Sequence, residues 1–126
     1  MSTMRGGLLF ANVIEFNQTW GHRNDVTGFY QGLRELDQTL PELVDLLREG
    51  DLMIMTADHG NDPTTPSTDH SREAVPVLAI GPGIDPVDLG TRPTFADIGA
   101  TVAEYFRVPA GAGTSFLRDV APWMTS

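Results

Sequence analysis

The chain has 126 residues with 17 acidic side chains, eight basic ones and a formal net charge of −9 at pH 7. This balance argues against nucleic-acid binding, which normally requires a basic surface. The chain has no cysteine, which excludes disulfides and thiolate metal sites. No apolar run approaches the ~20 residues of a membrane span and no signal peptide is evident, so we expect a cytoplasmic protein of one domain or part of one.

The first half of the chain has the pattern of a strand followed by a long helix. The apolar run from Leu8 to Phe16 predicts a mostly buried strand. Asn24 or Asp25 then suits the N-cap of a helix, and we expect its apolar stripe to lie in the core. The stripe comprises Phe29, Leu33, Leu36, Leu40, Leu43, Leu46 and Leu47. Pro41 lacks an N–H, so the helix should kink or restart there.

A second apolar run, residues 52–57, ends abruptly in Asp58 and His59, followed by Gly60. A buried parallel strand delivers polar groups in this way to the carboxyl edge of a sheet, where open α/β folds bind ligands. Strand, helix and strand with this length of crossover predict a right-handed parallel βαβ unit.

The rest of the sequence predicts one more strand and one more helix. Residues 74–80 read as a third strand, closed by Gly81-Pro82-Gly83. Thr94 suits the N-cap of a helix with an apolar face of Phe95, Ile98, Val102 and Phe106. We expect the last residues of the chain to be frayed. The predicted fold class is α/β, with a parallel sheet flanked by helices.

Polar residues around the second strand indicate a metal site. His70 follows His59 by eleven residues, too far for one helical face, so a loop must fold back to bring it near. A carboxylate, Asp58, and two imidazoles suit a borderline divalent cation such as Zn²⁺ or Mn²⁺. The alternative is an N-capping aspartate with ordinary loop histidines, and spacing alone leaves the two close to even. The intervening hydroxyl residues are more typical of turns than of nucleophiles; they are Thr64, Thr65, Ser67 and Thr68.

Three stretches extend this motif: Thr56-Ala-Asp-His-Gly60 with Asp62-Pro-Thr64, then Thr68-Asp-His70-Ser-Arg-Glu73, then Val75-Pro-Val77. Together they resemble the carboxyl-terminal part of phosphopentomutase, in the alkaline phosphatase superfamily of two-metal phosphoryl-transfer enzymes. Thr56 to Gly60 also resembles cofactor-independent phosphoglycerate mutase, but the extension through His70 and Glu73 favours the pentomutase. The resemblance runs from about Leu8 to Leu117.

The resemblance implies an isomerase that moves a phosphoryl group between the C1 and C5 oxygens of ribose or 2-deoxyribose phosphate, using two Mn²⁺ ions. It implies five metal-ligand positions, with Asn17, His22 and His70 at one ion and Asp58 and His59 at the other. Asn17 departs from the family, which has aspartate there. Glu15 lies two residues earlier, on the same face of the predicted strand, and is the alternative ligand.

The resemblance also implies that residues 1–126 form the carboxyl-terminal part of an alkaline phosphatase-like metalloenzyme core domain. The family's amino-terminal strand, threonine nucleophile and cap domain have no counterpart here, so no catalytic residue is assigned and we expect no activity from the chain alone. Its partners would be a pentose phosphate and a missing amino-terminal half, with no nucleic acid and no membrane. The alternatives are a split subunit, a degenerate copy, a non-catalytic metal-binding or interaction module, and a phosphoglycerate mutase-like fragment.

Overall fold

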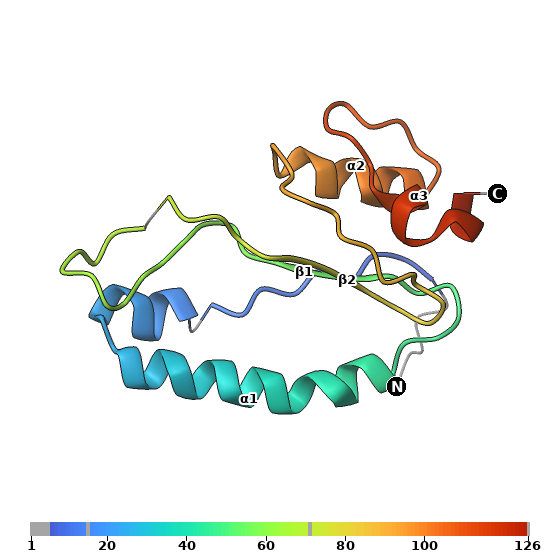
Figure 1. The fold of residues 1–126 in the computed structure, drawn as a ribbon. Helices are drawn as coiled ribbons and strands as arrows, with labels where there is room; N and C mark the ends of the chain where they lie inside the picture. The colour runs from blue at the N-terminus through green and yellow to red at the C-terminus, as the bar shows by residue number, and fades with distance from the viewer. Residues whose placement is uncertain (1–5, 15, 71, 126) are drawn as a thin grey trace. The chain divides into compact units, whose positions relative to one another are not determined.

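The computed structural model describes residues 6–14, 16–70 and 72–125. The chain divides into two compact units, Met1–Leu40 with Ala57–Val75, and Pro41–Thr56 with Pro76–Ser126. The division falls inside the long helix α1 (Val26–Asp45), shown in Figure 1. None of the helices in the described ranges is long and apolar enough to cross a membrane.

Helix α1 begins as the sequence predicts and ends at Asp45, before the last two leucines of the predicted stripe. The Asp25 carboxylate accepts a hydrogen bond from the backbone N–H of Gly28 at 2.9 Å, which confirms Asp25 as the capping side chain. The helix runs unbroken through Pro41, so the predicted restart does not occur. The expectation that its leucine stripe is core is wrong, because Leu33 is 48% exposed and Leu46, just beyond the helix, is 73% exposed.

The predicted first strand does not form in the part of it that the structure describes. Residues 8–14 have no regular secondary structure, and the side chains of Leu9 and Phe10 are 82% and 84% exposed. Phe16 instead begins a short π-helix, η1 (Phe16–Trp20), and a 3₁₀ turn, η2 (Gly21–Arg23), follows it. A strand requires a neighbour to satisfy its backbone, and none of the described strands pairs with this run.

The sheet of the second unit is antiparallel, which corrects the predicted parallel βαβ unit. Strand β1 (Met53–Thr56) pairs with β2 (Val77–Ile80), with Met53 opposite Ile80 and Thr56 opposite Val77. A parallel pair needs a crossover that carries the chain back to the same end of the sheet. The connection over residues 57–76 contains no described helix to do this, so the chain simply folds back. The third predicted strand is confirmed over its last four residues, ending before Gly81.

The core of the second unit lies in the segment that was expected to fray. Phe116, Leu117, Val120 and Ala121 are at most 2% exposed and form its centre. They lie in and around the short helix α3 (Leu117–Val120), which is followed by the 3₁₀ helix η3 (Pro122–Thr125). Partly buried side chains surround them, namely Leu52, Ile54, Val77, Ala79, Ile84, Leu89, Ile98, Tyr105 and Met124. The expectation of a frayed end is therefore wrong for the residues up to Thr125.

Helix α2 (Ala96–Tyr105) buries the predicted apolar face only in part, since Ile98 packs against the core and Val102 is half-buried. Thr94 Oγ1 accepts a hydrogen bond from the N–H of Ala96 at 3.2 Å, so Thr94 does contribute at the helix start. Phe95 and Phe106, however, are 55% and 39% exposed. The buried residues of α2 are Asp97, Ala100 and Thr101.

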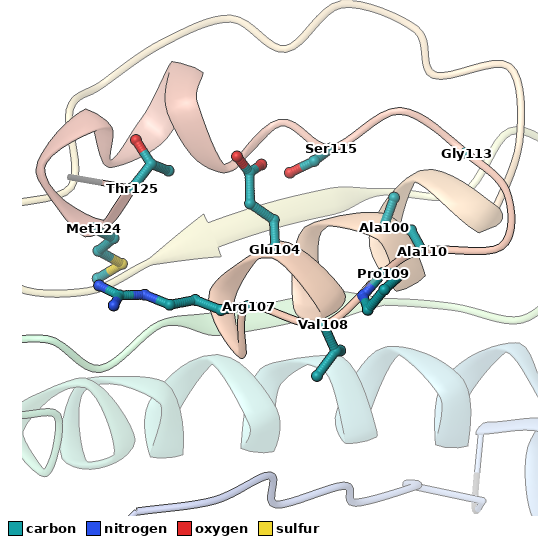
Figure 2. A pocket seen from close by; sticks show the side chains of 10 residues that line it. All are labelled: Ala100, Glu104, Arg107, Val108, Pro109, Ala110, Gly113, Ser115, Met124 and Thr125. Atoms are coloured by element: carbon teal, nitrogen blue, oxygen red, sulfur yellow. The ribbon is translucent and has the colours of Figure 1, made fainter.

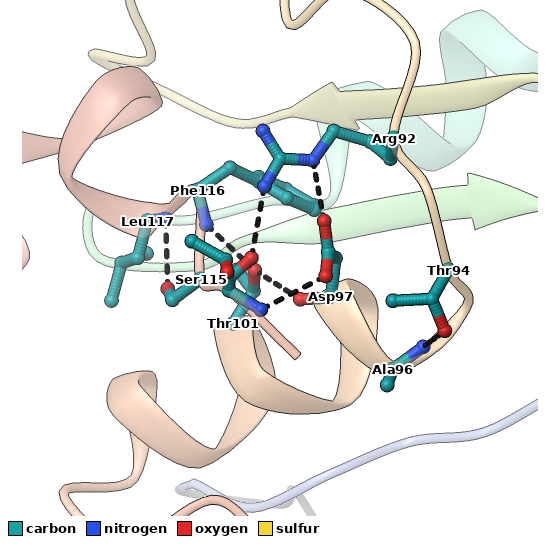
Figure 3. Close-up of polar contacts among 9 residues, drawn as sticks. Arg92, Thr94, Ala96, Asp97, Thr101, Ser115, Phe116 and Leu117 are labelled. Atoms are coloured by element: carbon teal, nitrogen blue, oxygen red, sulfur yellow. Dashed lines mark hydrogen bonds and ion pairs between the residues drawn. The ribbon is translucent and has the colours of Figure 1, made fainter. Parts of the chain in front are cut away.

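Asp97 and Thr101 turn towards the carboxyl-terminal segment and bind it (Figure 3). The Asp97 carboxylate accepts hydrogen bonds from Arg92 Nε at 2.8 Å and from the backbone N–H of Thr114 at 2.9 Å. Thr101 Oγ1 accepts one from the N–H of Phe116 at 3.0 Å. The Thr114 N–H, followed by Arg92, lowers the pKa of Asp97 although burial opposes the charge. Buried polar groups on α2 thus fix the segment that supplies the core.

Candidate metal centre

Three histidines converge within the first unit, each from a different segment. His22 lies in η2, His59 follows β1, and His70 lies in the long loop before β2. The rings of His59 and His70 are stacked, with centroids 3.6 Å apart and 15° between their planes. The His22 ring centroid is 5.3 Å from that of His70. The prediction that the loop folds back to bring His70 to His59 is confirmed.

Two of these rings are held in a defined tautomer. His22 Nδ1 lies 2.7 Å from the carbonyl oxygen of Thr68, and His59 Nδ1 lies 3.0 Å from that of Gly60. A carbonyl oxygen can only accept, so each Nδ1 carries the proton and donates it. In the neutral ring Nε2 is then left with its lone pair free. Metal-binding histidines typically have this arrangement, with the second ring nitrogen tied to a carbonyl or carboxylate.

Asp58 lies at the edge of this cluster and is mostly solvated. Its Oδ1 is 3.6 Å from His59 Nε2, and its side chain is 83% exposed compared with 22% for His59. Asn17 lies in η1, but its side chain is outside what the structure describes, as is Glu15. The choice between Asn17 and Glu15 as a ligand therefore stays a prediction.

The cluster contains atoms suited to binding a metal ion, but they are not arranged as a coordination sphere. Within residues 6–14, 16–70 and 72–125 no group of three or more His, Asp or Glu side chains is placed to hold a metal ion. The rings of His59 and His70 are nearly parallel, so their lone pairs do not point at one position. One ring must tilt before both can bind the same ion. Imidazole nitrogens and a carboxylate nonetheless suit a borderline divalent cation.

The loop that carries His70 is organised by Asp62, which belongs to the sequence motif but was assigned no structural role in it. Its Oδ1 accepts hydrogen bonds from the N–H of Thr64 at 2.9 Å and from the Thr64 hydroxyl at 2.6 Å. These two bonds, the hydroxyl first, lower the pKa of Asp62. Thr65 Oγ1 donates to the Asp62 carbonyl, and Ser67 Oγ accepts from the N–H of Asp69. Thr64, Thr65 and Ser67 thus take part in turns, as predicted, and Asp62-Pro63-Thr64 was the available signal for an Asx turn.

A cavity of about 490 Å³ lies in the second unit, between the end of α2 and the carboxyl-terminal segment (Figure 2). Its acidic lining residue, Glu104, already accepts a hydrogen bond from Arg118 Nε at 3.0 Å. Bonds from Ser115 and then Arg118 lower the pKa of Glu104. None of the five predicted metal-ligand residues lines this cavity, and we assign it no role in the candidate site.

Comparison with known families gives the decisive observation. The sequence matches the metalloenzyme superfamily over residues 2–110, most of its length. The chain belongs to the metalloenzyme superfamily. This assignment agrees with the resemblance to the alkaline phosphatase-like enzymes, which placed the ligand positions in residues 17–70, inside the matched range.

The chain is also similar to phosphopentomutases. It is 60% identical over 114 residues to the phosphopentomutase of Anaeromyxobacter sp. (strain K), covering 90% of this chain and 29% of that protein. It is 53% identical over 115 residues to that of Carboxydothermus hydrogenoformans, and 50% identical over 119 residues to that of Dictyoglomus turgidum. These matches cover 90% and 93% of this chain, and 30% of each relative. The chain therefore spans less than a third of the length of these relatives.

Proposed function

We propose that this chain is the metal-binding carboxyl-terminal part of a phosphopentomutase-type enzyme, an isomerase that moves a phosphoryl group between the C1 and C5 oxygens of a pentose phosphate. The observation that carries the proposal is the convergence of His22, His59 and His70, three residues from separate segments, in a chain 60% identical to a phosphopentomutase. We infer that the chain forms part of an alkaline phosphatase-like core, whose remaining ligands and nucleophile come from elsewhere.

The five proposed ligands fall into two groups. His22 and His70, with Asn17 or Glu15, would hold one Mn²⁺ ion, and Asp58 and His59 would share the second. Bound cations of this kind neutralise phosphoryl oxygens and activate a hydroxyl nucleophile. The chain's own contribution is to present Nε2 of His22 and of His59, since both Nδ1 atoms are engaged by carbonyls. The Asp58 carboxylate lies beside His59 Nε2, where its charge favours a cation.

The transferred phosphoryl group needs a nucleophile that these residues do not provide. Thr64 and Thr65 both use their hydroxyls in turn hydrogen bonds to Asp62. We infer that the nucleophile lies in the part of the related phosphopentomutases that this chain does not match. The exposed apolar run at residues 8–14, with Leu8, Leu9 and Phe10 all more than 60% exposed, supports a partner segment that covers it.

Complementation tests this proposal. The partner is the Anaeromyxobacter sp. (strain K) phosphopentomutase without the 114 matched residues, mixed with this chain and Mn²⁺. We expect conversion of ribose 1-phosphate to ribose 5-phosphate by the mixture, none by either part alone, and loss of turnover with His70→Ala. A complex that forms without turnover would reject the enzyme role and favour an interaction module. Turnover by this chain alone, abolished by Thr64→Ala or Thr65→Ala, would show that the nucleophile is here.

A further inference from the structure

The indole of Trp20 lies on a glycine groove of α1. Gly28 and Gly32 are one helical turn apart on the same face. A Cβ atom built at either position would come within 3.0 Å of the Trp20 ring, a separation that real side chains do not show. Gly32 is also buried. The ring therefore occupies space that only glycine leaves free.

Two aromatic contacts add to the packing of η1 on α1. The Phe16 ring meets the Trp20 ring edge-on, with centroids 5.3 Å apart, and meets the Phe29 ring of α1 in the same way at 5.3 Å. Both ends of η1 are thus fastened to the first two turns of α1. Edge-to-face pairs of this kind favour a defined geometry over a sliding one.

The turn that carries His22 begins directly after Trp20. The Trp20 carbonyl accepts a hydrogen bond from the N–H of Asp25 at 2.9 Å, and that of Gly21 accepts one from Asn24 at 3.0 Å. Gly21 is buried, and a Cβ there would collide with the side chain of Asn61, two residues after His59. The turn is therefore fixed on one side by α1 and on the other by the His59 segment.

We propose that Trp20, seated on Gly28 and Gly32, is the positioning residue for His22 as a metal ligand. This inference rests on the proposed function, because it requires His22 to bind the ion. Displacing the indole shifts the backbone at Trp20, two residues before His22. This shift disturbs the hydrogen bond from His22 Nδ1 to the Thr68 carbonyl, the bond that leaves Nε2 of His22 free. The role is indirect, since Trp20 itself contributes no donor to the ion.

Gly32→Ala is the sharpest test, because every close neighbour of a Cβ there belongs to Trp20, whereas Gly28 also abuts Asp25. Gly99→Ala in α2 is the matched control, since it has nothing within 4 Å. Alanine normally stabilises a helix interior relative to glycine. We expect Gly32→Ala to weaken Mn²⁺ binding by about 10- to 100-fold, the usual effect of disturbing a ligand's support, and Gly99→Ala to leave it unchanged.

A double-mutant cycle with His22→Ala separates positioning from general damage. In that background Gly32→Ala should cause no further loss of Mn²⁺ binding. Equal losses in both backgrounds, or parent-like binding by Gly32→Ala, would overturn the inference. If the parent chain binds no Mn²⁺, the proposed function fails. The positioning claim is then decided by proton NMR of the His22 Nδ1–H, whose hydrogen-bonded resonance should disappear in Gly32→Ala and persist in Gly99→Ala.

Discussion

The imidazole of His59 lies flat against that of His70, with ring centroids 3.6 Å apart, although a loop of ten residues separates them in sequence. The contact closes the loop that Asp62 organises, and the His70 ring also lies beside that of His22. Because His59 Nδ1 is engaged by the Gly60 carbonyl, its Nε2 remains free for an ion. The proposed site assigns the two stacked rings to different ions, so we expect metal binding to separate them, and His70, whose ring makes no hydrogen bond within the described part of the chain, to move more than His59.

The first prediction concerns the core of the second unit. Phe116 is fully buried, so Phe116→Ala should lower the free energy of unfolding by about 3–5 kcal/mol. Phe95, which is 55% exposed, is the control, and Phe95→Ala should cost less than about 1 kcal/mol. Urea denaturation measures both, with Phe116→Leu as the milder variant if the alanine form does not fold. Equal losses at the two positions would mean that residues 116–121 are not the core.

The second prediction follows from the lowered pKa of Asp97. The ionised carboxylate is held by the Thr114 N–H and by Arg92, so its folded pKa lies below the usual 3.8. Its contribution to stability is therefore fully present above about pH 4, and is lost as the pH falls through the folded pKa. Asp97→Asn should lower the unfolding temperature at neutral pH and flatten its decline between about pH 4 and pH 2.

Asp119→Asn is the control for this measurement, because it removes the same charge from an exposed position in α3. Thermal unfolding followed by circular dichroism across the pH range gives the two profiles. If Asp97→Asn and the parent lose stability in parallel below pH 4, the buried network around Asp97 does not carry the acid sensitivity.

The third prediction concerns the departure from the family at residue 17. Asn17→Asp adds a unit charge, and hard cations prefer charged oxygen ligands. Mn²⁺ binding should tighten by about 1–2 kcal/mol, the scale of a charge-assisted contact. The gain should vanish when His22→Ala and His70→Ala remove the co-ligands. No gain in the parent, together with a loss on Glu15→Ala, would identify Glu15 as the ligand.

Local sequence signals predicted the parts of the fold that short-range chemistry determines. Asp25 at the start of α1, the end of β2 before Gly81 and the turn hydroxyls around Asp62 all depend on neighbours within a few residues. The pairing of β1 with β2 was not predictable in this way, because an apolar run does not specify its partner or its direction. The burial of Phe116 was missed because Asp97 and Thr101, buried polar residues of α2, fix its segment, and the apolar face predicted for that helix did not include them.

The candidate site was predicted only where it depends on residue type and on spacing along the chain. The return of the loop that brings His70 to His59 was predicted from their eleven-residue spacing, and their residue types indicated a metal. The seat of Trp20 on Gly28 and Gly32 could not be read from sequence, since glycines in a helix usually only weaken it. The seat depends on the approach of the Trp20 ring to both glycines in three dimensions.

Calorimetric titration of the chain with Mn²⁺ tests the central claim most directly. The parent and an Asp88→Ala control, altered in the second unit, should bind Mn²⁺ weakly and alike. Asp58→Ala and His59→Ala should each reduce the affinity, because one removes a charged oxygen and the other a ring held with Nε2 free. Unchanged binding in both variants would contradict the assignment of this cluster as a metal site.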